Sequence, residues 1–188
     1  MSVLKAGHLR MAALTLVAGA AIALPTGAKA SITNGLSVRL GAFFPQSAGL
    51  RTVTDFAVWG GGIEYKVNWI PHIFAGEGWS TSISADIHYT ERKTGLFRFI
   101  PVSINQVYNF ERSAGMQSYA GICLTAATFG GNMTGVGKQP TITRLGGGVI
   151  LGSNITDHIY VEGRYEWFDR HHSAVDPQGF RAYAGYRF

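Results

Sequence analysis

The chain has 188 residues, of which 46% are hydrophobic, and a formal net charge of +5. Its single cysteine, Cys123, excludes an intramolecular disulfide. Beyond residue 30, no apolar stretch is long and uninterrupted enough for a transmembrane helix. Lys5, Arg10 and Lys29 contribute three of the five charges, so residues 31–188 carry only +2 and give no reason to expect nucleic-acid binding.

Residues 1–30 have the features of a cleaved signal peptide. A basic start is followed by an apolar run over residues 11–24 and by Ala28-Lys29-Ala30, which fits a cleavage site. The run is shorter than the ~20 apolar residues that a membrane-spanning helix needs, so a retained membrane anchor is the weaker alternative. The sequence therefore predicts export, with residues 31–188 as one domain.

Eight segments of the mature chain alternate apolar and polar residues with a period of two, which predicts β-strands. They cover residues 37–44, 57–69, 79–90, 96–110, 119–126, 144–152, 159–167 and 180–188. In the fourth segment the alternation changes phase at Pro101, which predicts a β-bulge. Most segments are long enough to cross a bilayer as tilted strands, which takes ~9–11 residues.

An even number of strands would place both termini on the periplasmic side of a bacterial membrane barrel. The connections at 46–52, 92–95, 129–139 and 170–178 would then face outward. Those at 71–78, 111–116 and 153–157 would face the periplasm. The outward loops are modest, so we do not expect strands that extend well beyond the membrane.

Alternation alone does not say which face of such a barrel points inward. A soluble, lipocalin-like barrel would place its apolar face inside. A membrane barrel is favoured because oppositely charged residues on neighbouring strands suit ion pairs in a narrow lumen. Glycines on the same polar face leave room for them, and four tryptophans near strand ends are typical of interfacial aromatic girdles. The expected lumen charges are Arg39, Lys66, Arg98, Arg144, Arg164, Arg181 and Arg187 with Glu64, Asp86, Glu162 and Glu166, a net of +3.

The last ten residues form an alternating strand that ends on an aromatic carboxy-terminus. Phe180, Tyr186 and Phe188 share its apolar face, and arginines lie between them. Such an ending resembles the assembly signal of bacterial outer-membrane barrels. We therefore expect the outer-membrane assembly machinery to recognise the C-terminal strand.

Three segments carry a wider resemblance, namely residues 36–45 (LSVRLGAFFP), 100–110 (IPVSINQVYNF) and 184–188 (AGYRF). They resemble the small eight-stranded outer-membrane barrels of the OmpA/OmpX-like superfamily. The resemblance implies an all-β, antiparallel, up-and-down transmembrane barrel in the outer membrane of a Gram-negative-type bacterium. Its expected partners are outer-membrane lipid and lipopolysaccharide, and a monomer is favoured.

Only one cluster suggests chemistry. His171 and Ser173 would lie on the same side of an extended strand, where an imidazole can activate a hydroxyl. This pair resembles the His-x-Ser pair of the outer-membrane lipid A 3-O-deacylases, but no glutamate follows Ser173 to complete a triad. The adjacent His171 and His172 would point to opposite faces, which disfavours a metal site.

The sequence therefore predicts a non-enzymatic outer-membrane barrel, without cofactor or metal, that has an envelope-structural or surface-interaction role. The first alternative is a narrow, anion-leaning pore for small solutes. Side chains usually fill the interior of an eight-stranded barrel, which ranks the pore lower. The second alternative is a deacylase-like esterase that uses His171 and Ser173.

Overall fold

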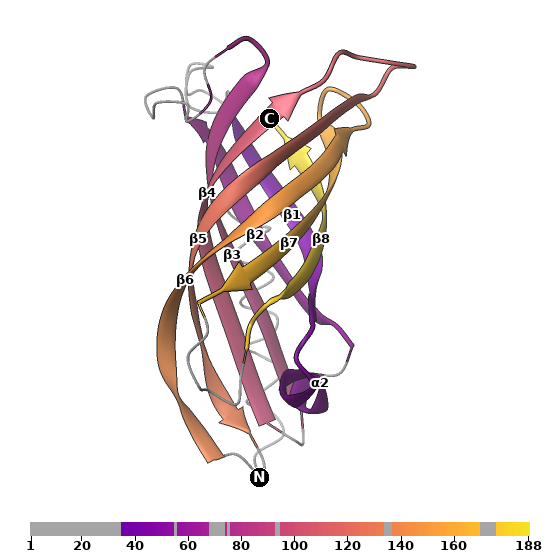
Figure 1. The fold of residues 1–188 in the computed structure, drawn as a ribbon. Helices are drawn as coiled ribbons and strands as arrows, with labels where there is room; N and C mark the ends of the chain where they lie inside the picture. Colours follow the sequence, from indigo (N-terminus) through magenta and orange to yellow (C-terminus); the bar gives the residue numbers. More distant parts are fainter. Residues whose placement is uncertain are drawn as a thin grey trace, which may run out of the picture. The chain divides into compact units, whose positions relative to one another are not determined.

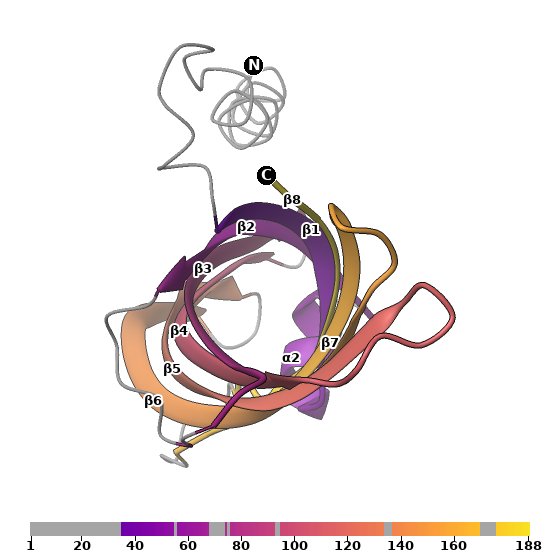
Figure 2. The ribbon, with the colours of Figure 1, turned by 90° about the horizontal axis from the view of Figure 1, so that it is seen from above.

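The computed structural model describes residues 35–54, 56–67, 74, 76–92, 95–133, 137–169 and 176–188. Within these ranges eight strands close into a barrel in chain order, each antiparallel to the next, and the last pairs with the first (Figures 1 and 2). They are β1 (Leu36–Pro45), β2 (Val58–Val67), β3 (Trp79–Arg92), β4 (Gly95–Asn109), β5 (Gln117–Met133), β6 (Gly137–Asn154), β7 (Ile159–Phe168) and β8 (Gly179–Arg187). The predicted all-β, up-and-down barrel is confirmed, whereas the signal peptide predicted over 1–30 lies outside the described residues.

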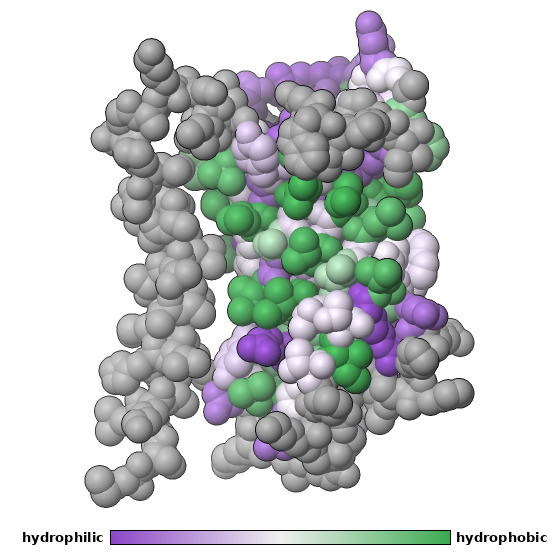
Figure 3. Space-filling model, turned by 90° about the vertical axis from the view of Figure 1, so that its left-hand side faces the viewer, coloured by the Kyte–Doolittle hydropathy of each residue, from purple (hydrophilic) through white to green (hydrophobic). Residues whose placement is uncertain are grey.

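The two faces of the barrel wall differ sharply in polarity. Outward-pointing leucines are strongly exposed, with Leu145 at 72% and Leu151 at 65%. Inward-pointing arginines are buried, and Arg39, Arg164 and Arg181 are each 1% exposed. Figure 3 shows the apolar side chains as a broad band across one side of the barrel. The predicted polar lumen is therefore confirmed, and the lipocalin-like alternative is wrong.

We call the end of the barrel that holds Leu36 and Phe188 the terminal end, and the opposite end the distal end. Aromatic side chains gather on the outer surface near both. At the terminal end the ring centroids of Trp79 and Tyr108 lie 5.4 Å apart. At the distal end those of Tyr165 and Trp167 lie 6.2 Å apart. Two such groups bracketing an apolar band are typical of a membrane barrel; one of the predicted girdle residues, Trp69, lies outside the described residues.

The bulge predicted at Pro101 is wrong. β4 keeps one register with β5 over its whole length, from Gly95↔Met133 to Asn109↔Tyr119, and one register with β3 on both sides of the proline. Proline has no N–H group to donate to the ladder, but the alternation of side chains continues through it. Phe97 and Phe99 therefore point into the lumen, while Arg98 is exposed on the outer face. Arg98 was expected among the lumen charges, and that expectation is also wrong.

The distal rim of the barrel is uneven. β5 and β6 have 17 and 18 residues, whereas β7 and β8 have 10 and 9. The outward loop predicted over 129–139 is wrong, because β5 continues to Met133 and β6 begins at Gly137. Pairing shifts by one residue toward the distal end, where Pro140 and Thr141 of β6 face the single Gly130 of β5, a β-bulge at a proline. Strands β3–β6 thus form a wall that extends past the rest of the distal rim (Figure 1), whereas we did not expect strands that extend well beyond the membrane.

The outward connection predicted over 46–52 folds mainly into a short helix, α2 (Ala48–Thr54), which ends two residues beyond it at the distal end. Ser47 begins it, because its hydroxyl accepts a hydrogen bond from the backbone N–H of Leu50 at 3.3 Å. Seen along the barrel axis, α2 lies partly within the outline of the ring (Figure 2). Among the described residues, no helix has the length and apolar character that a membrane span requires.

The closed lumen as the candidate functional site

An ion-pair network fills the middle of the lumen, and Arg39 of β1 lies at its centre. The guanidinium of Arg39 donates to both carboxylate oxygens of Asp86, at 2.7 and 2.8 Å. It also donates to Glu64 at 2.7 Å and to Glu162 at 3.2 Å. One fully buried cation from β1 thereby joins carboxylates from β2, β3 and β7, and charge-assisted, bidentate contacts of this kind are among the stronger hydrogen bonds in proteins.

Two further arginines, Arg164 of β7 and Arg181 of β8, extend the network around the barrel. Arg164 donates to Glu162 and to Glu64, the latter at 2.9 Å. Arg181 donates to Asp86 at 3.1 Å and forms an ion pair with Glu166. Three arginines thus meet four carboxylates, so the charges in the centre nearly cancel.

Neutral polar groups hold these charged side chains in place. The hydroxyl of Tyr183 accepts a hydrogen bond from Arg181 at 3.0 Å, and the guanidinium carbon of Arg39 lies 4.4 Å from the centroid of its ring. The Asn105 side chain accepts a hydrogen bond from Arg164 at 2.9 Å, and Tyr119 donates to Glu162 at 3.0 Å. Each strand except β6 contributes to the network or its neutral partners, so it ties the wall together across the lumen.

Glycines on the inner face provide the space that these side chains occupy. A Cβ atom added at Gly62 would overlap with the carboxylate of Asp86 on the next strand. Added at Gly152 or Gly185, it would overlap with the ring of Tyr119 or Tyr160. The sequence predicts that inward glycines make room for charged side chains, but in several places the side chain lodged above the glycine is an aromatic ring.

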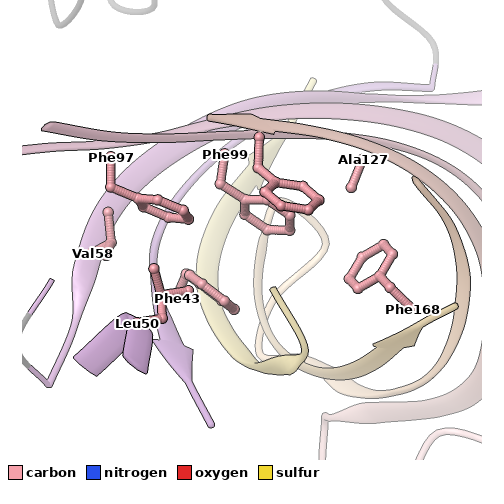
Figure 4. Close-up of a cluster of buried hydrophobic side chains, with 8 residues drawn as sticks. Phe43, Leu50, Val58, Phe97, Phe99, Ala127 and Phe168 are labelled. Carbon is pink, nitrogen blue, oxygen red and sulfur yellow. The ribbon is translucent and has the colours of Figure 1, made fainter. Parts of the chain in front are cut away.

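On the distal side of the network, an apolar cluster closes the lumen (Figure 4). Its members point toward one another from several strands and from α2, whose Leu50 is fully buried. The ring centroids of Phe43 and Phe99 lie 4.8 Å apart, and those of Phe99 and Phe168 lie 6.1 Å apart. The cluster consists of Phe43, Leu50, Val58, Phe97, Phe99, Ala127, Phe129 and Phe168. This cluster was not predicted from the sequence, although the alternation of β4, continued back through Pro101, would have placed Phe97 and Phe99 inside.

On the other side of the network, a cavity of about 100 Å³ lies within the terminal half of the lumen. Hydroxyl, amide and charged side chains line it, including Ser82, Asn105 and Glu64. Its volume and polarity suit several water molecules. The network and the apolar cluster lie between this cavity and the distal opening.

The structure brings seven of the eleven predicted lumen charges together in the network: Arg39, Glu64, Asp86, Glu162, Arg164, Glu166 and Arg181. Lys66 and Arg187 instead line the cavity, and Arg187 donates to the side chain of Asn154 at 3.2 Å. Arg144 lies toward the distal end, where it donates to the backbone oxygen of Asp169 at 2.9 Å. Without Arg98, the net charge of the predicted set falls from +3 to +2.

The remaining predicted residues lie elsewhere. Phe180 and Tyr186 are exposed on the outer face of β8, and the N–H of Phe188 donates to the backbone oxygen of Leu36 at 3.0 Å. The weak catalytic candidates His171 and Ser173 lie outside the described residues. Within the described ranges, no group of three or more histidine, cysteine or acidic residues is placed to hold a metal ion.

A closed antiparallel barrel with a charged lumen, an apolar outer band and two aromatic girdles defines an outer-membrane barrel. The chain belongs to the outer membrane protein beta-barrel domain family, whose model matches residues 12–188. Membership places the chain in the outer membrane of a Gram-negative-type bacterium. Following the rule for such barrels, the terminal end faces the periplasm and the distal end faces outward.

The chain is also similar to solved structures of other barrels. Neisserial surface protein A is 15% identical, with a TM-score of 0.56 over 81% of this chain and 94% of that one. The N-terminal β-barrel domain of Pseudomonas aeruginosa OprF is 12% identical, with a TM-score of 0.48 over 83% of this chain and 98% of that one. Comparison with curated proteins gives no significant match. At such low identity, the first similarity supports a shared fold alone.

Proposed function

We propose that this protein is a non-enzymatic outer-membrane barrel that acts through its surfaces, in envelope structure or in contacts outside the cell. The observation that supports this role is the closed lumen. Arg39, Arg164 and Arg181 fill its centre with their four carboxylate partners, and the apolar cluster with Leu50 lies beyond them. A solute entering from the periplasm would meet both layers.

The narrow pore is the less supported alternative. A conducting path would require the central arginines to leave their carboxylates and the rings around Phe99 to separate. If the barrel conducts nevertheless, the net charge of +2 on the remaining lumen residues still predicts a preference for anions.

Planar-bilayer recording tests the closed lumen. Refolded protein, checked by its heat-dependent mobility on a denaturing gel, should give no current steps under conditions in which a general porin conducts. Reproducible steps from folded protein would refute the proposal, and a salt gradient would then read the ion preference.

The proposed absence of enzymatic activity is tested on lipid A. Cells that overexpress the protein should contain lipid A of unchanged mass, identical to that of cells expressing the Ser173→Ala variant. A loss of one acyl chain with the wild type alone would establish the deacylase alternative. We also propose that the C-terminal strand binds the outer-membrane assembly machinery and that lipopolysaccharide is a lipid partner.

A further inference from the structure

Arg98 stands out on the outer face of the barrel because it is an exposed cation next to the lipid-facing surface. On the periplasmic side of Arg98, the outward positions of β4 are apolar. Ile104 and Val102 are 45% and 46% exposed, and Ile100 is the next outward residue beside Arg98. Arg98 is thus the first charged residue of this face on the outward side of the apolar band. Among the described residues, its guanidinium forms no ion pair.

The residues paired with Arg98 form a small polar surface on the same face. Tyr89 of β3 lies directly opposite it on one side and Gly130 of β5 on the other. Because a glycine has no side chain, the sheet beside the guanidinium is open on that side. One step toward the membrane, Thr128 and Thr143 pair across β5 and β6, with their hydroxyl oxygens 3.0 Å apart.

These side chains match the chemistry of a phosphorylated sugar. An arginine guanidinium binds a phosphate through two parallel N–H···O bonds. Tyr89 lies directly across from Arg98, and its hydroxyl donates to the carboxylate of Glu91 at 2.9 Å. Thr128 lies diagonally across from Arg98 on β5, and Thr143 lies one strand further along the wall. Hydroxyl groups spread over neighbouring strands in this way suit the hydroxyls of a sugar that extends along the wall from the phosphate. The surface is also continuous with the apolar band, so a lipid whose acyl chains cover Val102 and Ile104 presents its headgroup at the level of Arg98. Figure 3 shows polar side chains becoming frequent at the lower, outward-facing end of this side.

We propose that Arg98, with Tyr89, Thr128 and Thr143, binds a phosphate and the adjoining sugar of a lipopolysaccharide molecule in the outer leaflet. The site lies on the outside of the wall formed by β3–β6, where the strands continue past the apolar band. Phospholipid headgroups also carry a phosphate, but they lack the sugar hydroxyls that the threonine pair would engage. This proposal does not depend on whether the lumen conducts.

The test measures lipid retention by native mass spectrometry of protein refolded in phosphatidylcholine nanodiscs that contain bisphosphorylated lipid A. Arg98→Gln should lower lipid A retention about tenfold, the loss expected for one charge-assisted hydrogen-bonded contact. Arg98→Lys should lie between, because it keeps the charge without the paired donors. Arg112→Gln is the matched control, since Arg112 is an exposed arginine in a periplasmic turn that pairs with Asp157.

Three results would overturn the proposal. The first is equal lipid A retention by the wild type and Arg98→Gln. The second is equal retention of lipid A from which both phosphates have been removed. The third is equally strong retention of phosphatidylglycerol, which would indicate a general attraction of anionic lipid. Arg98 is exposed on the outer face, so its substitution leaves the lumen network intact, and a heat-dependent gel shift verifies folding of each variant.

Discussion

Replacing Arg39 by methionine should destabilise the barrel by about 3 kcal/mol, the lower end of the cost of removing one partner from a buried ion pair. Arg39 is completely buried and contacts Asp86, Glu64 and Glu162. The cost should not be larger, because each carboxylate keeps a second arginine: Asp86 retains Arg181, and the two glutamates retain Arg164. Equilibrium unfolding in guanidinium of the barrel refolded into lipid vesicles measures the difference.

The exposed pair of Arg112 and Asp157 provides the comparison. Their side chains are 51% and 79% exposed, so Arg112→Gln should cost less than about 1 kcal/mol. The double variant Arg39→Met with Asp86→Asn should lose less unfolding free energy than the two single variants lose in total, because the charge left unpaired in each single variant is then absent. If Arg39→Met unfolds at the same denaturant concentration as Arg112→Gln, the network does not stabilise the barrel and the reasoning fails.

Leu50→Ala should destabilise the folded protein by about 2–5 kcal/mol, because it leaves a cavity in the apolar cluster that α2 completes; an unchanged unfolding midpoint would show that α2 does not pack there. Gly152→Ala should lower the stability of the barrel, since the new methyl group overlaps with the ring of Tyr119. Gly147→Ala is the control and should be tolerated, because the nearest atom to its new methyl group would be 3.4 Å away. Equal unfolding midpoints of the two variants would contradict the packing role of the inward glycine. Deletion of Phe188 should reduce the amount of barrel in outer-membrane fractions, as measured by the heat-dependent gel shift, and normal insertion would argue against a terminal assembly signal.

Period-two alternation predicted the barrel because each strand has one face in lipid and one in the lumen. It placed Arg39 and Asp86 on the inner face correctly. A charge on the lipid face costs several kcal/mol, so charged residues within the apolar band are found on the inner face. Alternation does not reveal which charges meet. The contact between Arg39 and Glu162 spans 123 positions and depends on the register of every strand between them.

Alternation misplaces residues where both faces of a strand are apolar or both are polar. Near Phe97 and Phe99 the lumen holds aromatic rings, so apolar residues no longer mark the outer face, and Arg98 was placed inside. Beyond Thr128, β5 and β6 leave the apolar band. Their outer face then carries polar residues that single-sequence reasoning reads as a loop. In both places the surroundings of one face change along the strand, from polar to aromatic in the lumen or from lipid to water outside. The alternation of side chains between the two faces continues unchanged.

The glycines of the inner wall restrict which substitutions such a lumen can accept during evolution. Tyr119 fills the space above Gly152, and Tyr160 fills the space above Gly185 on the neighbouring strand. A larger residue in place of either glycine requires a smaller one in place of its tyrosine. The two positions of each pair should therefore covary, although they lie in different strands. In related sequences, substitutions at the two positions should occur together. Where an aromatic residue replaces the glycine, a glycine should replace the tyrosine on the paired strand.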